Sequence, residues 1–283
     1  MGNGRLALRF RQWKLRWRSA RALREYEHRI TQGHRSERPH GLPRPLVVSL
    51  TSFPPRFPVL EKTLNCLLLQ SIRPDHVVLW LAHEDLAKLP ESILQLRALG
   101  LEIRGTVDLR SFTKIIPTLD KFPDAFVVTA DDDVYYWPTW LEELVDSHRR
   151  TGDPVICHRG HQIRLGKDRL PVPYNRWHRG TRRSTVSPLL FPTGVMGVFY
   201  DPRIFHSDIN RPDLFQHLCP MADDVWLYWM HRINSVTPRL LPCRHRVLEW
   251  PGGQEQNLRS SNVGQSGNDV AIGQMIQHYG WPK

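Results

Sequence analysis

Residues 125–133 read AFVVTADDD, an apolar and β-branched run that ends directly in three aspartates. Continuous rather than alternating apolarity is typical of a strand covered on both faces, as in a parallel sheet. Further runs of this kind lie at residues 46–50, 76–81, 101–107 and 155–157. The repeated pattern predicts several buried strands, one of which ends at the three aspartates.

Segments with helical spacing of apolar residues separate these runs, at residues 59–70, 92–99, 115–122 and 140–150. Strands that alternate with helices predict an α/β fold with a doubly wound, mostly parallel sheet flanked by helices, and ligands at the carboxyl ends of the strands. A later strand is expected at residues 195–200 and a later helix at residues 222–233. The basic, Pro-containing stretch 171–192 is expected to be a loop.

The positive charge of the chain is unevenly distributed. The 39 Lys and Arg outnumber the 28 Asp and Glu by 11, but residues 1–44 carry +9 and residues 158–183 carry +7, which leaves −5 for the rest. A protein that coats a phosphate backbone usually spreads its positive charge along the docking face. We therefore expect no nucleic-acid partner, and a non-enzymatic, basic nucleic-acid-binding protein is kept as an alternative.

Cysteine usage and hydropathy indicate the compartment. The four cysteines are too far apart for a C-x-x-C zinc or redox motif and lie in or beside apolar segments, so they are expected to be buried free thiols. Such thiols fit a reducing compartment. No apolar run approaches the roughly 18 residues of a transmembrane helix, and no signal-peptide core is present. These features predict a cytoplasmic protein.

The first 30 residues form a basic arm. If residues 5–24 are helical, one apolar stripe forms, flanked by basic residues, and consists of Leu6, Phe10, Trp13, Trp17 and Ala20. A basic helix with tryptophans suits an anionic membrane surface, which predicts peripheral attachment to the inner face of the cytoplasmic membrane. Packing against the chain's own body or a partner protein is the alternative. Residues 31–45, rich in Gly and Pro, are expected to be a linker.

Three adjacent carboxylates at the end of a strand repel one another unless a cation neutralises them. In an extended chain alternate residues point to the same side, so Asp131 and Asp133 are expected to converge while Asp132 faces away. Carboxylate oxygens suit Mg²⁺ or Mn²⁺, which substrate phosphates commonly complete. The alternative is a solvated acidic turn, which the buried-strand context disfavours.

A second acidic pair, Asp223-Asp224, opens the expected helix at residues 222–233. Carboxylates in the first turn of a helix can simply cap it and stabilise its dipole. One of the pair is expected to do so, and the other to face the cleft as a general base. A helix N-terminus lowers the pKa of a carboxylate, so a useful base there needs a partly desolvated pocket.

Four stretches together resemble bacterial GT-A-type, nucleotide-sugar-dependent glycosyltransferases related to family 2, of the kind found in capsule and surface-polysaccharide synthesis. They are VSLTSFPPRF at 48–57, VVTADDDVY at 127–135, GVMGVFY at 194–200 and ADDVW at 222–226. A D-x-D motif alone is a weak signal, but four blocks in this order on a βα framework are more specific. The resemblance covers roughly residues 46–235 and leaves out the arm and the tail.

The resemblance implies roles for individual residues. Donor binding is expected from Thr51, Ser52, Arg56, Lys114, Asp131 and Asp132. Metal binding to the donor diphosphate is expected from Asp131 and Asp133, with Mn²⁺ or Mg²⁺ as the cofactor. The sequence does not identify a third metal ligand, for which the candidates are His245, His278 and Asp269. For Lys114 the alternative is a solvated lysine at the start of a helix.

The reaction explains why these residue types are needed. Breaking the bond from the anomeric carbon to phosphate leaves a nucleoside diphosphate, whose charge a divalent ion neutralises. The acceptor hydroxyl must lose its proton, and Asp224, or else Asp223, is the candidate base. One base and one metal imply inversion of configuration, although a retaining enzyme would not need that base. A nucleotidyltransferase is the enzymatic alternative, disfavoured by the absence of a Gly-rich phosphate loop.

The acceptor is expected to be a glycan or a lipid-linked molecule, bound near Gly194, Gly197, Trp177 and Arg159. The two glycines would let substrate approach the backbone, or alternatively mark a turn or bulge. The expected organisation is an arm (1–30), a linker (31–45) and a catalytic domain (46–283). That domain divides into a nucleotide-sugar half (46–157), an acceptor-binding and catalytic half (158–250), and a C-terminal loop and helix (251–283), the helix starting near Asn268.

Overall fold

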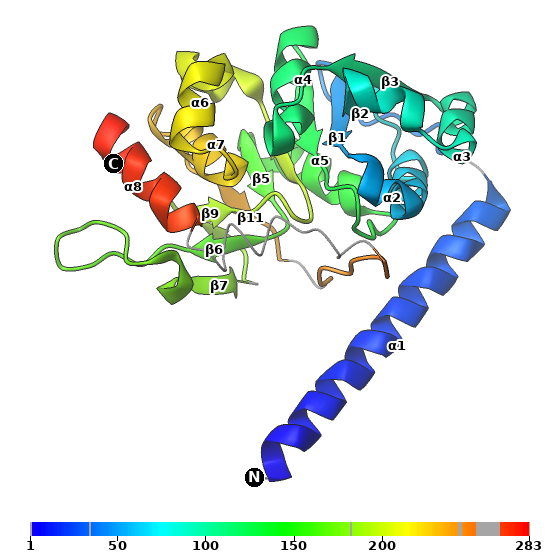
Figure 1. Ribbon diagram of the computed structural model, residues 1–283, viewed down its shortest axis with the longest axis horizontal. Coiled ribbons are helices and arrows are strands. Elements are labelled where there is room, and N and C mark those ends of the chain that lie inside the picture. Colours follow the sequence, from blue (N-terminus) through cyan, green and yellow to red (C-terminus); the bar gives the residue numbers. More distant parts are fainter. Residues whose placement is uncertain (1, 34, 182, 243–244, 253–266, 283) are drawn as a thin grey trace.

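The computed structural model describes residues 2–33, 35–181, 183–242, 245–252 and 267–282 (Figure 1). The tail at 252–267, which the sequence predicts to be a loop, lies almost wholly outside the described residues, as do Cys243 and Arg182. The other three cysteines are free and buried, as expected: Cys66, Cys157 and Cys219.

An eight-stranded sheet runs through the body, in the order β3-β2-β1-β4-β10-β5-β11-β8. The strands β3, β2, β1 and β4 are mutually parallel, β5 and β11 are parallel to each other, and β10 and β8 run antiparallel to their neighbours. The bounds are β1 Leu46–Thr51, β2 His76–Ala82, β3 Leu101–Thr106, β4 Phe126–Thr129, β5 Val155–Cys157, β8 Thr185–Val186, β10 Val198–Tyr200 and β11 Arg239–Leu240. The predicted α/β fold with a mostly parallel sheet is confirmed.

Helices cover both faces of this sheet (Figure 1). One core packs under α2, α3 and α5, and a second under α4, α6, α7 and α8. Val48 belongs to the first core and its neighbour Val47 to a separate cluster on the other side, which explains why the strand is continuously apolar. The bounds are α2 Phe57–Leu68, α3 Glu91–Gln95, α4 Ile116–Lys121, α5 Trp140–Thr151, α6 Pro212–Leu218, α7 Asp223–Arg232 and α8 Gly267–Tyr279.

The stretch 171–192 is not the loop that the sequence predicts. It contributes β7 (His178–Thr181), β8 and β9 (Leu190–Pro192), and β6 (Gly160–Gln162) pairs with both β7 and β9. The three form a second, antiparallel sheet in the order β7-β6-β9. Because these strands are short and β7 is polar, no apolar run marks them. A hydrogen bond from the Gly180 amide to Nδ1 of His161 (3.1 Å) helps hold β7 in place.

The N-terminal arm is a single helix, α1 (Gly2–Gln32), longer than the expected 5–24. Its N-terminal part extends away from the body, whereas its last turns pack against it (Figure 1). Ala22 is buried, and Arg29 donates from Nη1 to the carbonyl oxygen of Tyr136 (3.0 Å) and from Nη2 to that of Cys66 (2.9 Å). Among the described residues, no helix is long and apolar enough to cross a bilayer.

The segment expected to be a linker lies along the body. The Arg73 amide donates to the carbonyl oxygen of Arg38 (2.8 Å), and Ser36 Oγ donates to that of Ser71 (2.9 Å). At its end Arg44 forms an ion pair of 2.6 Å with Asp201. Residues 35–44 are therefore fastened to the body at several points rather than spanning open space.

Candidate active site

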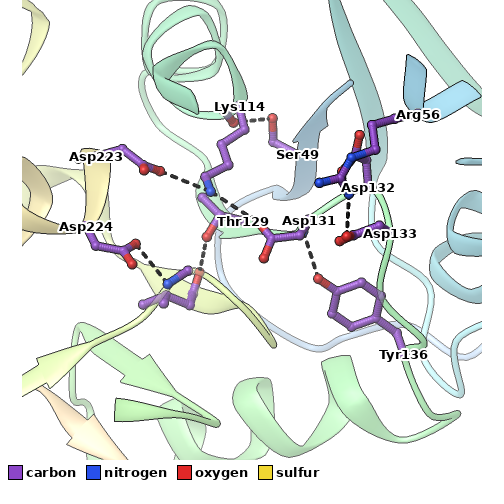
Figure 2. Close-up of polar contacts among 12 residues, drawn as sticks. Ser49, Arg56, Lys114, Thr129, Asp131, Asp132, Asp133, Tyr136, Asp223 and Asp224 are labelled. Atoms are coloured by element: carbon purple, nitrogen blue, oxygen red, sulfur yellow. Dashed lines mark hydrogen bonds and ion pairs between the residues drawn. The ribbon is translucent and has the colours of Figure 1, made fainter. Parts of the chain in front are cut away.

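Two acidic motifs that are far apart in the sequence meet at the carboxyl ends of the central strands (Figure 2). Asp131–Asp133 follow β4, and Asp223 and Asp224 form the first turn of α7. Lys114, at the end of a 3₁₀ turn (Arg110–Lys114), lies between them. This is the edge of the sheet at which α/β folds bind their ligands.

Lys114 joins the two motifs. Its Nζ lies 3.2 Å from Oδ1 of Asp131 and 3.0 Å from Oδ2 of Asp223 (Figure 2), and its side chain is only 9% exposed. Burial alone would lower the pKa of Lys114, but the surrounding carboxylates outweigh burial and raise that pKa well above its usual value. The side chain is therefore a permanent buried cation and not a solvated lysine.

The backbone of Lys114 is also fixed. Ser49 Oγ, on β1, donates to the Lys114 carbonyl oxygen (2.6 Å) and lies 2.7 Å from Oγ1 of Thr118. Trp80 Nε1 donates to Oγ1 of Thr118 (2.8 Å). Ser49, Thr118 and Trp80 thus position the cation, a role that no motif in the sequence suggested.

Asp224 accepts a hydrogen bond of 2.8 Å from the Gly194 amide on its Oδ1 (Figure 2). Burial, followed by the negative charge of Asp223, raises the pKa of Asp224 to about 7, although Lys114 opposes the shift. A Cβ atom at Gly194 would lie 2.9 Å from Asp224 Oδ1 and 3.1 Å from Lys114 Nζ. Residue 194 must therefore be glycine for the carboxylate and the ammonium to keep these positions.

The three aspartates do not alternate as expected. Asp131 faces Lys114, whereas Asp132 and Asp133 share Arg56 (Figure 2). Ser52 Oγ donates to Oδ2 of Asp132 (2.6 Å). The prediction that Asp132 faces away from Asp133 is wrong, because β4 ends at Thr129 and the chain beyond it turns instead of staying extended.

The crowding of carboxylates shifts their titration. Burial and then the charges of Asp132 and Asp131 raise the pKa of Asp133 to about 7, against the effect of Arg56. Burial also raises the pKa of Asp132. Two cations, Lys114 and Arg56, face five carboxylates in this site: Asp131, Asp132, Asp133, Asp223 and Asp224. The site thus holds an excess of negative charge and favours a further cation.

Tyr136 and Trp250 hold the aspartate loop in place. The Asp131 amide donates to the hydroxyl of Tyr136 (2.8 Å), and the Trp250 amide donates to the carbonyl oxygen of Asp133 (2.8 Å). Both side chains are buried. Tyr136 follows the acidic motif in the sequence, but nothing in the pattern indicated that its hydroxyl would reach back to Asp131.

Of the other residues predicted for the site, some lie beside the residues described above and one does not. Thr51 is half-buried beside Ser52 and donates to the Trp80 carbonyl oxygen (3.0 Å). Arg159 Nη1 donates to Oγ1 of Thr193 (2.7 Å), next to Gly194. Trp177 is not brought to the carboxylates: it is buried, and its Nε1 donates to the Val172 carbonyl oxygen (2.7 Å).

Gly197 is explained by packing. Its φ is +86°, and a Cβ atom there would lie 2.4 Å from Cζ2 of Trp140. The Trp140 indole is fully buried and donates to the Met196 carbonyl oxygen (2.7 Å). Glycine at 197 therefore makes room for Trp140, which corresponds to the turn that was the alternative for this position.

No group of three or more His, Cys, Asp or Glu side chains among the described residues is arranged to hold a metal ion. The candidates for a third ligand have other contacts. His245 stacks on Trp137 with ring centroids 4.0 Å apart, and His278 packs against Tyr279 at 4.5 Å. Asp269 Oδ1 accepts from the Tyr174 amide (2.6 Å).

Comparison with known proteins shows the fold. A structure of residues 1–349 of TarS from S. aureus matches with a TM-score of 0.51 and 11% identity, over 82% of this chain and 65% of that one. The same fragment in complex with UDP gives a TM-score of 0.48 at 11% identity, with the same coverage. The chain thus spans less than two thirds of the length of these structures. The chain has a GT-A-like fold.

More distant similarity extends to another structure. Glucosyl-3-phosphoglycerate synthase from Mycobacterium tuberculosis, in complex with Mn²⁺, UDP and phosphoglyceric acid, matches with a TM-score of 0.33 and 17% identity, over 44% of this chain and 48% of that one. No protein-family profile matches the chain, and no curated protein matches it in sequence.

Proposed function

We propose that the chain is a metal-dependent glycosyltransferase that moves a sugar from a nucleotide-sugar donor to a hydroxyl group of a glycan or lipid-linked acceptor. The observation that carries this proposal is the pairing of two acidic motifs through buried Lys114 on a GT-A-like sheet. One motif offers carboxylates for a cation, and the other offers a carboxylate whose pKa is raised to about 7. Synthesis of surface polysaccharide or another glycoconjugate is the expected context.

The donor would bind where β1 and β4 end. Thr51, Ser52 and Arg56 line this edge, and Ser52 and Arg56 already hold Asp132. Lys114 lies on the side of α7 and would face the diphosphate. A cation that is permanently charged can stabilise the negative charge that grows on the departing nucleoside diphosphate.

The donor set fits a divalent cation. Oxygen ligands suit Mg²⁺ and Mn²⁺, and Mg²⁺ commonly uses one or two protein carboxylates together with substrate phosphates. Asp131 and Asp133 would supply those carboxylates, and five carboxylates against two cations would otherwise repel an anionic diphosphate. When bound, the ion would neutralise charge on the leaving diphosphate.

The general base in this proposal is Asp224. Asp223 is engaged by Lys114, whereas Asp224 has a pKa of about 7, near the value at which a base is most effective. The acceptor oxygen would form a bond to the anomeric carbon as the bond from that carbon to the phosphate oxygen breaks. The hydroxyl proton passes to Asp224, and the nucleoside diphosphate leaves with the bonding electrons. Attack opposite the leaving group gives inversion.

The arm is proposed to hold the enzyme on the inner, anionic face of the cytoplasmic membrane through residues 5–24. Phe10, Trp13 and Trp17 are 56%, 60% and 51% exposed on the part of α1 that extends from the body. Tryptophan and phenylalanine at such a surface enter the headgroup region while the neighbouring basic residues meet lipid phosphates.

The test is a screen of the full chain with Mn²⁺ or Mg²⁺ against a panel of nucleotide sugars. Thermal shift measures binding, and release of nucleoside diphosphate measures turnover. A shift and turnover that both disappear in Asp133→Ala and on metal chelation support the transferase. Binding of no nucleotide sugar, with wild type and Asp133→Ala indistinguishable, would refute it. Release of pyrophosphate from a nucleoside triphosphate and a sugar phosphate would favour the nucleotidyltransferase instead.

A further inference from the structure

The second sheet and its connecting loops carry a concentration of exposed, positively charged side chains. We use the term basic sheet for β6, β7 and β9 with their connections, residues 158–192. Its exposed cations are Arg164, Lys167, Arg169, Arg176, Arg179 and Arg183. Within the described part of the chain, none of these six forms an ion pair, and the basic sheet contains a single acidic residue, Asp168.

Several exposed cations elsewhere on the molecule form ion pairs. Arg38 contacts Glu142 at 2.6 Å, Arg73 contacts Glu37 at 2.7 Å, and Arg211 contacts Asp213 at 2.7 Å. Others, such as Arg97, Lys121 and Arg150, have no ion pair among the described residues but are far apart in the sequence, whereas the basic sheet gathers six such cations in one segment. Concentrated charge without internal counterions raises the local concentration of anions and speeds their association.

The basic sheet is joined to the active site. Arg159, directly before β6, donates to Thr193, and the next residue, Gly194, donates to Asp224. The Arg179 guanidinium lies 5.7 Å from the ring centroid of Tyr174. Burial and then the charge of Asp224 raise the pKa of Tyr174, which belongs to the basic sheet, to about 12, while Arg159 and Arg179 oppose this.

The aromatic residues of the basic sheet are unsuited to stacking on bases or entering a bilayer. Tyr174 and Trp177 are both buried and pack against each other with ring centroids 4.7 Å apart. Single-stranded nucleic acid is usually held by exposed aromatic platforms, and membrane-surface elements by exposed aromatic rings. The exposed charged groups here are guanidinium and ammonium apart from Asp168, beside three partly exposed aliphatic side chains, Leu165, Leu170 and Val186.

We propose that the basic sheet binds an acceptor that is itself a polyanion, a glycan chain with phosphate or carboxylate groups along its length. Guanidinium groups recognise both anions. A chain lying along the sheet would be led past Arg159 and Thr193 to Asp224, which would then meet its terminal hydroxyl. The role as acceptor rests on the proposed function, whereas the binding itself does not.

The test compares two triple variants of the full chain that remove the same charge from different places. One is Arg176→Gln/Arg179→Gln/Arg183→Gln on the basic sheet. The other is Arg97→Gln/Lys121→Gln/Arg150→Gln, at exposed positions outside it. Binding of polygalacturonate, of inorganic polyphosphate and of neutral dextran is measured at several salt concentrations, with melting temperatures to show that both variants fold.

We expect wild type and the second variant to bind both polyanions with similar affinity and the first to bind about tenfold more weakly, with a shallower dependence on salt. Dextran should not bind. Equal polyanion affinity of the two variants would overturn the proposal. The proposal would also be overturned if the first variant lost more affinity for duplex DNA, or for vesicles with anionic lipid, than for polygalacturonate and polyphosphate.

Hydrolysis of the nucleotide sugar without acceptor separates this proposal from the transferase itself. Both variants should hydrolyse the donor at the wild-type rate, because none of the six substituted residues belongs to the donor site. Wild-type protein that binds polyanions through the basic sheet but neither binds nor hydrolyses any donor would refute the transferase and leave the binding surface standing.

Discussion

The Nζ atom of Lys114 lies 3.0 Å from Oδ2 of Asp223, and this contact joins the loop after β4 to the start of α7 through a single side chain. Both side chains are buried, so water cannot solvate either charge if its partner is removed. The geometry makes the donor half and the acceptor half of the proposed active site dependent on one lysine. Five experiments test this arrangement and its surroundings.

Lys114→Met should lower both stability and donor binding. The change leaves Asp131 and Asp223 buried without their cation, and breaking a buried ion pair in this way costs about 3–5 kcal/mol. Urea denaturation measures the stability, and nucleotide-induced thermal shift measures donor binding. Lys114→Arg keeps the charge and should retain more of both. A Lys114→Met protein that is as stable as wild type would show that the buried pair contributes nothing.

Gly194→Ala should reduce transfer more than donor binding. The new methyl group would lie 2.9 Å from Asp224 Oδ1, so the carboxylate must move away from its amide donor. Misplacing a catalytic group by about 1 Å can cost on the order of a hundredfold in rate. Gly273→Ala on α8 is the matched control, because a Cβ there meets nothing within 4 Å. Unchanged turnover in Gly194→Ala would remove Asp224 from the reaction.

The pH dependence of the reaction should follow Asp224. A base must be ionised, and since burial raises the pKa of Asp224 to about 7, transfer should rise with pH below about 7 and level off above it. The profile of kcat/KM against pH measures this rise, to which Asp133 also contributes because its pKa is likewise raised to about 7. Asp224→Asn should bind donor but transfer no sugar over the whole range.

The carboxyl group of Asp224 should also make the stability of the protein depend on pH. Transfer should rise with pH, whereas stability should fall. The folded protein keeps a proton on Asp224 that the unfolded chain releases near pH 3.8, so this stabilisation is complete below pH 3.8 and is lost as the pH rises through about 7. Asp224→Asn carries no such charge. Its melting temperature should therefore exceed that of wild type by more at pH 8 than at pH 5, and equal differences at both pH values would contradict the assignment.

Two truncations should separate the exposed part of α1 from its packed end. Deletion of residues 1–20 removes Phe10, Trp13 and Trp17, and we expect loss of pelleting with anionic vesicles at an unchanged melting temperature. Deletion of residues 1–30 also removes Ala22 and Arg29, which contact the body, and should lower the melting temperature. If the shorter deletion pellets like wild type, residues 1–20 are not the membrane contact.

Much of the sheet could be predicted because burial on both faces leaves a continuous apolar signal. Val47 and Val48 face opposite cores, and so both must be apolar. The strand β7, which reads HRGT, carries no such signal and was missed. Its place depends on pairing with β6 and on His161, contacts that local pattern does not encode.

The acidic motifs could be located from the sequence, but not their partners. Nothing in the spacing indicated that Lys114 would contact both motifs, since the contact depends on how the turn before α4 meets α7. The orientation predicted for Asp132 was wrong, because the prediction continued the alternation of strand side chains beyond the end of β4. Trp177 was expected at the acceptor site, yet its indole completes a hydrophobic core instead.

Arg29 connects α1 to the proposed active site. Its guanidinium holds the carbonyl oxygen of Tyr136, and the hydroxyl of the same tyrosine holds the amide of Asp131. A force applied to α1 therefore reaches the first carboxylate of the loop through one side chain. A displacement of α1 would therefore be transmitted to the proposed donor site, and α1 and the aspartate loop are expected to move together.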